Sequence, residues 1–160
     1  MIRPAKEHEA KILSDLAVRS KSYWPYDEKF IQDCKDDLSL NPDHIKAGMV
    51  YVYEENDKPI GYYGFDSKAE FPEMICLFVE PEYIGKGIGL KLWSHSLTFA
   101  KNNNWQSFKI VADPYAAENF YLKVGCKQTG TYQSPVREDR KLPLLEYSLK
   151  TSKECYGTKL

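Results

Sequence analysis

The sequence has no long apolar run and no excess of either charge. No stretch of its 160 residues approaches the roughly 20 apolar residues that a membrane-spanning helix needs. Residues 1–7 contain no apolar segment of the kind found in a secretory signal peptide. The 22 Lys and Arg residues nearly balance the 23 Asp and Glu residues, which gives a net charge of −1. We therefore expect a cytoplasmic protein that binds neither nucleic acid nor a membrane.

Cysteine and histidine are too scattered to form a disulfide framework or a metal site. No C-x-x-C pair occurs among the four cysteines, Cys34, Cys76, Cys126 and Cys155. A chain of this length can bury a core without disulfides, and so we expect reduced thiols. The histidines His8, His44 and His95 lack the spacing of zinc ligands, and so we expect no metal.

Helical and strand patterns alternate along the chain, which predicts one α/β or α+β domain over residues 1–150 and a C-terminal tail over 151–160. Apolar spacing and capping residues predict helices at 7–19, 27–38, 87–101 and 116–124. Strands are expected at 2–3, 49–54, 59–65, 74–79, 108–112, 127–132 and 144–149. Asn41-Pro42 predicts a turn. The continuous apolar character of 74–79 predicts burial on both faces of that strand.

Three glycines follow the strand at 74–79 and open the next helix: Gly85, Gly87 and Gly89. Glycine permits positive φ and close approach of a ligand to the backbone. A helix N-terminus adds unpaired N–H groups and partial positive charge, so this loop predicts a phosphate or pyrophosphate site with Lys86 at its rim. A P-loop is excluded because no Lys-Ser or Lys-Thr follows, and a Rossmann fingerprint because its third glycine would fall at Leu90 or Leu92. A tight turn without a ligand is the alternative.

The residues around this loop resemble the central motif of the GCN5-related N-acetyltransferases. The family pattern, hydrophobic-x-V-x-P-x-[YF]-[RQ]-G-x-G-[IL]-G, is matched at Val79, Pro81, Tyr83, Gly85, Gly87, Ile88 and Gly89. The sequence departs from it at Ile84, where the family has Arg or Gln. Residues 113–126 resemble the family segment D-P-x-A-x-x-F-Y-x-x-x-G-[FAC], with one residue inserted. The resemblance covers nearly the whole chain.

This resemblance implies a mixed central sheet of six to seven strands, splayed in the middle and flanked by about four helices. It also implies acetyl-CoA as co-substrate. The pantetheine arm would lie along the backbone of Leu77, Phe78 and Val79. The pyrophosphate would meet the N–H groups of Gly85, Lys86, Gly87, Ile88, Gly89 and Leu90. Asn119 and Phe120 would also contact the cofactor, although Asn119 is equally typical of a surface helix.

Two residues match positions that carry proton transfers in the family. Tyr121 matches the tyrosine that protonates the leaving thiolate, and its alternative role is packing. Glu73 matches a glutamate that some members use as a base. Ordered water could be the base instead, and Glu73 would then be only a solvated residue at the end of a strand. A base matters because an amine with a pKa of about 10.4 is only ~0.1% neutral near pH 7.4.

In this fold the segment between the first two helices walls the acceptor side, and here it carries Tyr23, Trp24 and Tyr26. Such aromatic side chains could enclose a small amine, or could simply anchor the loop. The expected activity is acetyl transfer from acetyl-CoA to a primary amine of a small molecule, by direct attack in a ternary complex. A non-catalytic CoA-binding or protein-interaction module is the alternative. Exposed strand edges near the C-terminus would allow a homodimer.

Overall fold

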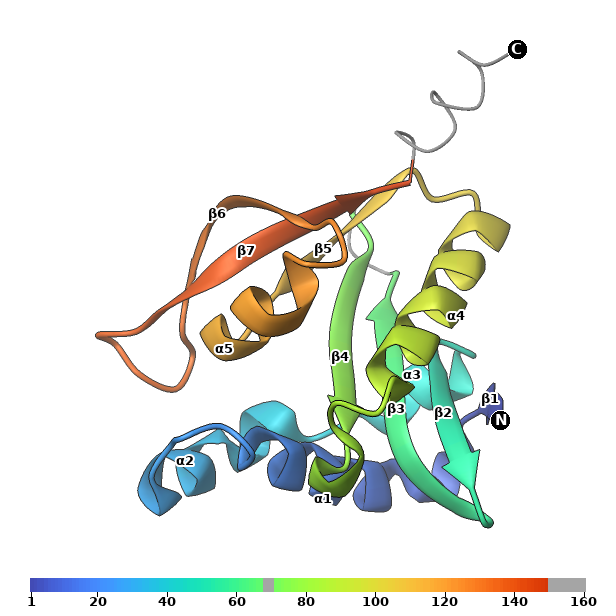
Figure 1. The fold of residues 1–160 in the computed structure, drawn as a ribbon, viewed down its shortest axis with the longest axis horizontal. Helices are drawn as coiled ribbons and strands as arrows, with labels where there is room; N and C mark the ends of the chain where they lie inside the picture. Colours follow the sequence, from blue (N-terminus) through green and yellow to red (C-terminus); the bar gives the residue numbers. More distant parts are fainter. Residues whose placement is uncertain (68–70, 150–160) are drawn as a thin grey trace. The chain divides into compact units, whose positions relative to one another are not determined.

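The computed structural model describes residues 1–67 and 71–149, which form two compact units (Figure 1). The first unit comprises Met1–Asp66 and Ile75–His95, and the second comprises residues 67–74 and those from 96 onward. The expected tail at 151–160 lies outside the described residues. None of the helices in the described part of the chain has the length and apolar character to cross a membrane.

The helices and strands form a mixed α/β fold, as the sequence predicts. The helices are α1 (Ala10–Lys21), α2 (Glu28–Leu38), α3 (Pro42–Lys46), α4 (Ile88–Asn102) and α5 (Pro114–Ala116), which continues as a π-helix (Ala117–Tyr121). Single 3-10 turns occupy Glu7–Glu9 and Pro81–Tyr83. The strands are β1 (Ile2–Pro4), β2 (Val50–Glu55), β3 (Lys58–Asp66), β4 (Glu73–Val79), β5 (Ser107–Val111), β6 (Lys127–Gln133) and β7 (Lys141–Ser148). By strand pairing their order is β1-β2-β3-β4-β5-β7-β6.

Several predicted elements differ from the structure. The helix expected at 116–124 runs instead from Pro114 to Tyr121. Helix α3 replaces the turn expected at Asn41-Pro42, because the Asn41 side chain accepts a hydrogen bond from the Asp43 N–H at 2.9 Å and Pro42 suits the first helical position. Strand β7 begins at Lys141 rather than at residue 144. Pro143 is tolerated there, and its carbonyl accepts a hydrogen bond from the Ala112 N–H at 3.0 Å.

In the first unit, two helices cover opposite faces of β2 and β3. Apolar side chains of α1 pack with one face in a cluster that contains Leu13, Leu16, Ala17, Val50, Val52, Tyr62 and Cys76. The start of α4 lies on the other face, where a Cβ added to Gly61 would be 3.0 Å from Leu92 Cδ1. The close approach of α4 to β3 therefore depends on a residue without a side chain, and it fixes the point at which α4 begins.

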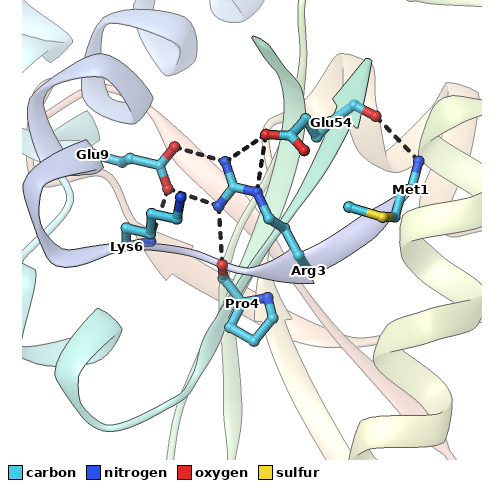
Figure 2. Close-up of polar contacts among 6 residues, drawn as sticks. All are labelled: Met1, Arg3, Pro4, Lys6, Glu9 and Glu54. Atoms are coloured by element: carbon cyan, nitrogen blue, oxygen red, sulfur yellow. Dashed lines mark hydrogen bonds and ion pairs between the residues drawn. The ribbon is translucent and has the colours of Figure 1, made fainter. Parts of the chain in front are cut away.

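A polar network secures the N-terminal strand to its neighbours (Figure 2). The Arg3 guanidinium donates hydrogen bonds to both carboxylate oxygens of Glu9, at 3.0 and 2.9 Å, and to Glu54 Oε1. The Met1 amino group donates to the Glu54 carbonyl at 3.1 Å. The bond from Arg3 lowers the pKa of Glu9, whose carboxylate is buried.

In the second unit, β5, β7 and β6 form an antiparallel sheet with Phe108, Ile110 and Leu145 in its core. The first residue of β4 joins this sheet in parallel, in the register Glu73↔Lys109. The Lys109 N–H extends the contact by donating to the Pro72 carbonyl at 3.0 Å. The parallel orientation of β4 and β5 agrees with the predicted strand–helix–strand unit.

Candidate functional site

The glycine loop has the backbone geometry that the sequence predicts for an anion site. Gly85 and Gly87 have φ values of +85° and +88°, which side-chain-bearing residues rarely adopt. A Cβ added to either glycine would meet nothing within 4 Å, so the backbone there is open. Helix α4 begins at Ile88, and the Lys91 N–H makes a helical bond to the Gly87 carbonyl at 3.1 Å. The N–H groups just before Lys91 are therefore those that a helix leaves without a helical partner.

The charge at this loop favours an anion. Helix α4 has 15 residues, and the positive end of its dipole lies at Ile88. Lys86 is exposed, and its ammonium lies 5.5 Å from the centre of the Tyr83 ring. The loop thus combines open backbone donors, a helix N-terminus and a lysine, and a phosphate or pyrophosphate fits this donor set.

Strand β4, which precedes the loop, is not buried on both faces, and that prediction is wrong. Met74 and Cys76 are buried, whereas Glu73, Ile75 and Leu77 are only half-buried. The alternation of burial is interrupted at Phe78, which is half-buried beside a buried Val79. Continuous apolar character cannot distinguish a face covered by other side chains from one that retains accessible surface.

The end of β4 is fastened to the C-terminal part of α1. The Val79 N–H donates to Ser20 Oγ at 3.3 Å. The next residue, Glu80, is buried and accepts two hydrogen bonds from the Arg19 guanidinium, at 2.8 and 2.7 Å. These bonds raise the pKa of Arg19. Sequence analysis missed all three contact residues, Arg19, Ser20 and Glu80, because the partners lie about 60 positions apart and no local pattern links them.

The aromatic segment after α1 already contacts an ammonium group. The Lys21 ammonium lies 5.3 Å from the centre of the Tyr26 ring and 5.6 Å from that of Phe30. Tyr23 and Trp24 pack edge to face at 5.0 Å, and Tyr23 is half-exposed. The rings of Tyr26 and Phe30 therefore already contact a cation, whereas Tyr23 and Trp24 contact each other.

The second unit contains the other predicted site residues: Glu73, Asn119, Phe120 and Tyr121. Glu73 is half-buried, and its Oε1 lies 3.9 Å from the Lys109 ammonium. Tyr121 is buried, and its ring packs edge to face with that of Phe120 at 5.3 Å. Asn119 is exposed, and its side-chain amide donates to the Tyr115 carbonyl at 2.8 Å.

The segment that carries these residues is fixed at both ends. Asp113 caps its start by accepting a hydrogen bond from the Tyr115 N–H at 2.9 Å, and it also pairs with Arg140. Gly125, with a φ of +109°, ends it, and the Cys126 N–H donates to the Tyr121 carbonyl at 3.0 Å. The positive φ of Gly125 is a conformation that glycine adopts without strain.

The sequence pattern of the acetyltransferase (GNAT) domain matches residues 10–150. The chain belongs to the GNAT acetyltransferase family. This finding confirms the predicted family and agrees with the loop geometry. No significant match is found among curated protein sequences.

Solved structures share the GNAT fold of this chain. The PaiA N-acetyltransferase of Thermoplasma acidophilum, in complex with coenzyme A, has a TM-score of 0.75 at 18% identity, covering 92% of this chain and 98% of its own. The Salmonella typhimurium protein yncA, with its cofactor acetyl-CoA, has a TM-score of 0.68 at 20% identity, covering 93% of each chain. The ribosomal-protein-S18-alanine N-acetyltransferase of Escherichia coli has a TM-score of 0.67 at 14% identity, with the same coverage. At these identities the likeness shows the fold and leaves the acceptor open.

Proposed function

We propose that this GNAT protein transfers an acetyl group from acetyl-CoA to a primary amine of a small molecule. The observation that carries the proposal is the glycine loop, in which Gly85 and Gly87 combine positive φ with open backbone at the N-terminus of α4. Such a loop suits the pyrophosphate of coenzyme A. Because residues 10–150 match the acetyltransferase (GNAT) domain, coenzyme A is the anion that we expect this site to bind.

The cofactor, when bound, supplies an activated acetyl thioester. The N–H groups from Gly85 to Leu90 and the Lys86 ammonium would hold its pyrophosphate. The backbone of Leu77, Phe78 and Val79 would hold the pantetheine arm, and Asn119 and Phe120 would also contact the cofactor. The half-buried face of β4 supports the pantetheine assignment, because a ligand there would cover apolar side chains that are otherwise part-exposed.

Two protons must move during the transfer. The attacking amine must lose one, and Glu73 would accept it directly or through a water molecule. The leaving sulfur gains one, and the Tyr121 hydroxyl would donate it. Tyr23, Trp24 and Tyr26 would border the acceptor. The Lys21 ammonium against the Tyr26 ring supports this assignment for Tyr26, since it indicates that this ring accepts a cationic amine.

A second candidate is a CoA-binding module without catalysis. Ile84 favours it, because the family has Arg or Gln at this position and isoleucine cannot supply a polar contact to the loop. The intact glycines and Tyr121 favour the enzyme. The enzyme would use the Tyr121 hydroxyl as an acid, whereas a packing role needs only the ring.

An amine panel distinguishes these candidates. The protein is incubated with acetyl-CoA and a panel of small primary amines and free-N-terminal peptides, and both free CoA and acetylated product are measured. We expect at least one small amine to give equal amounts of CoA and N-acetyl product, well above hydrolysis without amine. Acetylation confined to the peptides would overturn the small-molecule assignment. Acetyl-CoA binding without acetylation of any amine would favour the non-catalytic module.

A further inference from the structure

The helical segment that ends at Tyr121 contains a wide turn. Residues Ala117–Tyr121 form a π-helix, and the Leu122 N–H donates to the Ala117 carbonyl, five residues back, at 2.9 Å. The preceding turn is ordinary, since the Ala117 N–H donates four residues back to Asp113 at 2.8 Å. Single π-turns within α-helices are uncommon and concentrate at functional sites.

The wide turn coincides with the extra residue in the sequence. Asp113 and Tyr121 are eight positions apart, whereas the D-P-x-A-x-x-F-Y pattern separates them by seven. In a regular α-helix of about 3.6 residues per turn, eight positions would rotate Tyr121 roughly 80° beyond two full turns. A turn with one additional residue removes most of that rotation, so Tyr121 returns to the face on which the shorter spacing would place it.

Asn119 bridges this turn with its side chain. Its amide donates to the Tyr115 carbonyl at 2.8 Å, four residues back, and so supplies a donor where the backbone hydrogen bonds change from four-residue to five-residue spacing. The side chain is exposed, and the bond therefore adds little to core packing. The exposed neighbour Glu118 offers a matched position on the same turn.

We propose that Asn119 is a positioning residue, whose amide maintains the wide turn and thereby the orientation of the Tyr121 hydroxyl. This inference rests on the proposed function, in which Tyr121 protonates the leaving sulfur. The positioning role of the Asn119 amide is separate from the cofactor contact proposed for the same residue. Small errors in the placement of a catalytic group have large effects on rate, so loss of this bond should lower kcat far more than it weakens acetyl-CoA binding.

Three variants test the role of the amide. Asn119→Ala removes the donor, and we expect kcat to fall about tenfold while the acetyl-CoA Kd, which depends mainly on the glycine loop, rises by no more than about threefold. Asn119→Ser keeps a donor, since Ser14 and Ser22 in this chain donate to carbonyls four residues back at 2.7 and 2.9 Å. Its kcat should stay within about threefold of the unmodified protein. Glu118→Ala is the control and should leave kcat unchanged.

A purely structural role predicts a different outcome. Alanine is a better helix former than asparagine, so Asn119→Ala should not lower the thermal unfolding midpoint. The inference would be overturned if Asn119→Ala lowered the unfolding midpoint and Glu118→Ala lost as much kcat as Asn119→Ala. A raised acetyl-CoA Kd with unchanged kcat in Asn119→Ala would also overturn it, and would assign Asn119 to cofactor binding.

A double-mutant cycle with Tyr121→Phe separates this inference from the proposed function. If Asn119 acts through the Tyr121 hydroxyl, then Asn119→Ala should lower kcat no further once that hydroxyl is absent. A full tenfold additional fall in the Tyr121→Phe background would refute the positioning role while leaving the acid role intact. Unchanged kcat in Tyr121→Phe alone would instead refute the acid role, and the positioning role with it.

Discussion

Replacement of Gly87 by Asp is expected to abolish acetyl-CoA binding. Residue 87 has a φ of +88° and opens onto free space, so the new side chain would project where the loop is open to a ligand. Its carboxylate would also oppose the pyrophosphate at the positive end of α4. Like-charge contacts cost several kcal/mol, and we therefore expect the Kd to rise by more than about 100-fold. Isothermal titration calorimetry with acetyl-CoA measures it.

Gly48→Asp is the matched control for this variant. Gly48 lies in the turn between α3 and β2, has a φ of +73°, and has equally open space around a Cβ. The same substitution there introduces the same charge and similar backbone strain away from the glycine loop. Its acetyl-CoA Kd should be unchanged. Tight binding by Gly87→Asp would show that the pyrophosphate lies elsewhere, and equal loss of binding in both variants would indicate general destabilisation.

The Tyr121→Phe variant is expected to bind acetyl-CoA normally and to turn over slowly. Phenylalanine keeps the ring that packs against Phe120 at 5.3 Å, and it removes only the hydroxyl. A positioned acid contributes about 10²–10⁴-fold to a rate, so kcat should fall within that range. Steady-state CoA release at saturating acetyl-CoA and amine gives kcat, and calorimetry gives the Kd.

Tyr132→Phe provides the matched control. Tyr132 is half-exposed on β6, within the same unit, and has no proposed role in the site. Loss of its hydroxyl should leave kcat and Kd unchanged. If kcat of Tyr121→Phe equals that of the unmodified protein across the pH range, Tyr121 is not the acid and the thiolate leaves by another route.

The sequence predicts the fold well where the signal is local. Asp is a residue type typical of a helix N-cap, and the Asp27 side chain before α2 accepts a hydrogen bond from the Phe30 N–H at 2.8 Å. The positive φ of Gly85 and Gly87 likewise follows from residue type and position. Local signals also have limits, because Asn41-Pro42 fits the start of a helix as well as a turn. Here the hydrogen bond from the Asp43 N–H to the Asn41 side chain accompanies the helix.

The site was predictable to the extent that it consists of contiguous motif residues. The order of residues 85–90 was enough to propose an anion site there, with a tight turn as the alternative. The ion pair of Arg19 with Glu80 could not be, because it forms between segments that only the fold brings together. The wide turn at Asn119 occupies an intermediate position. The extra residue is visible in the sequence. Whether the helix takes it up as a wide turn depends on whether backbone and side-chain donors can satisfy the displaced carbonyls.

The most direct test of the glycine loop as a coenzyme A site is a thermal-shift comparison of acetyl-CoA, ATP and NAD with the unmodified protein. A ligand that binds only the folded state raises the unfolding temperature, and at about 100 times its Kd it stabilises by about 2.7 kcal/mol. We predict a clear rise with acetyl-CoA, and little or none with ATP or NAD. Stabilisation by ATP or NAD alone, with no effect of acetyl-CoA, would contradict the assignment.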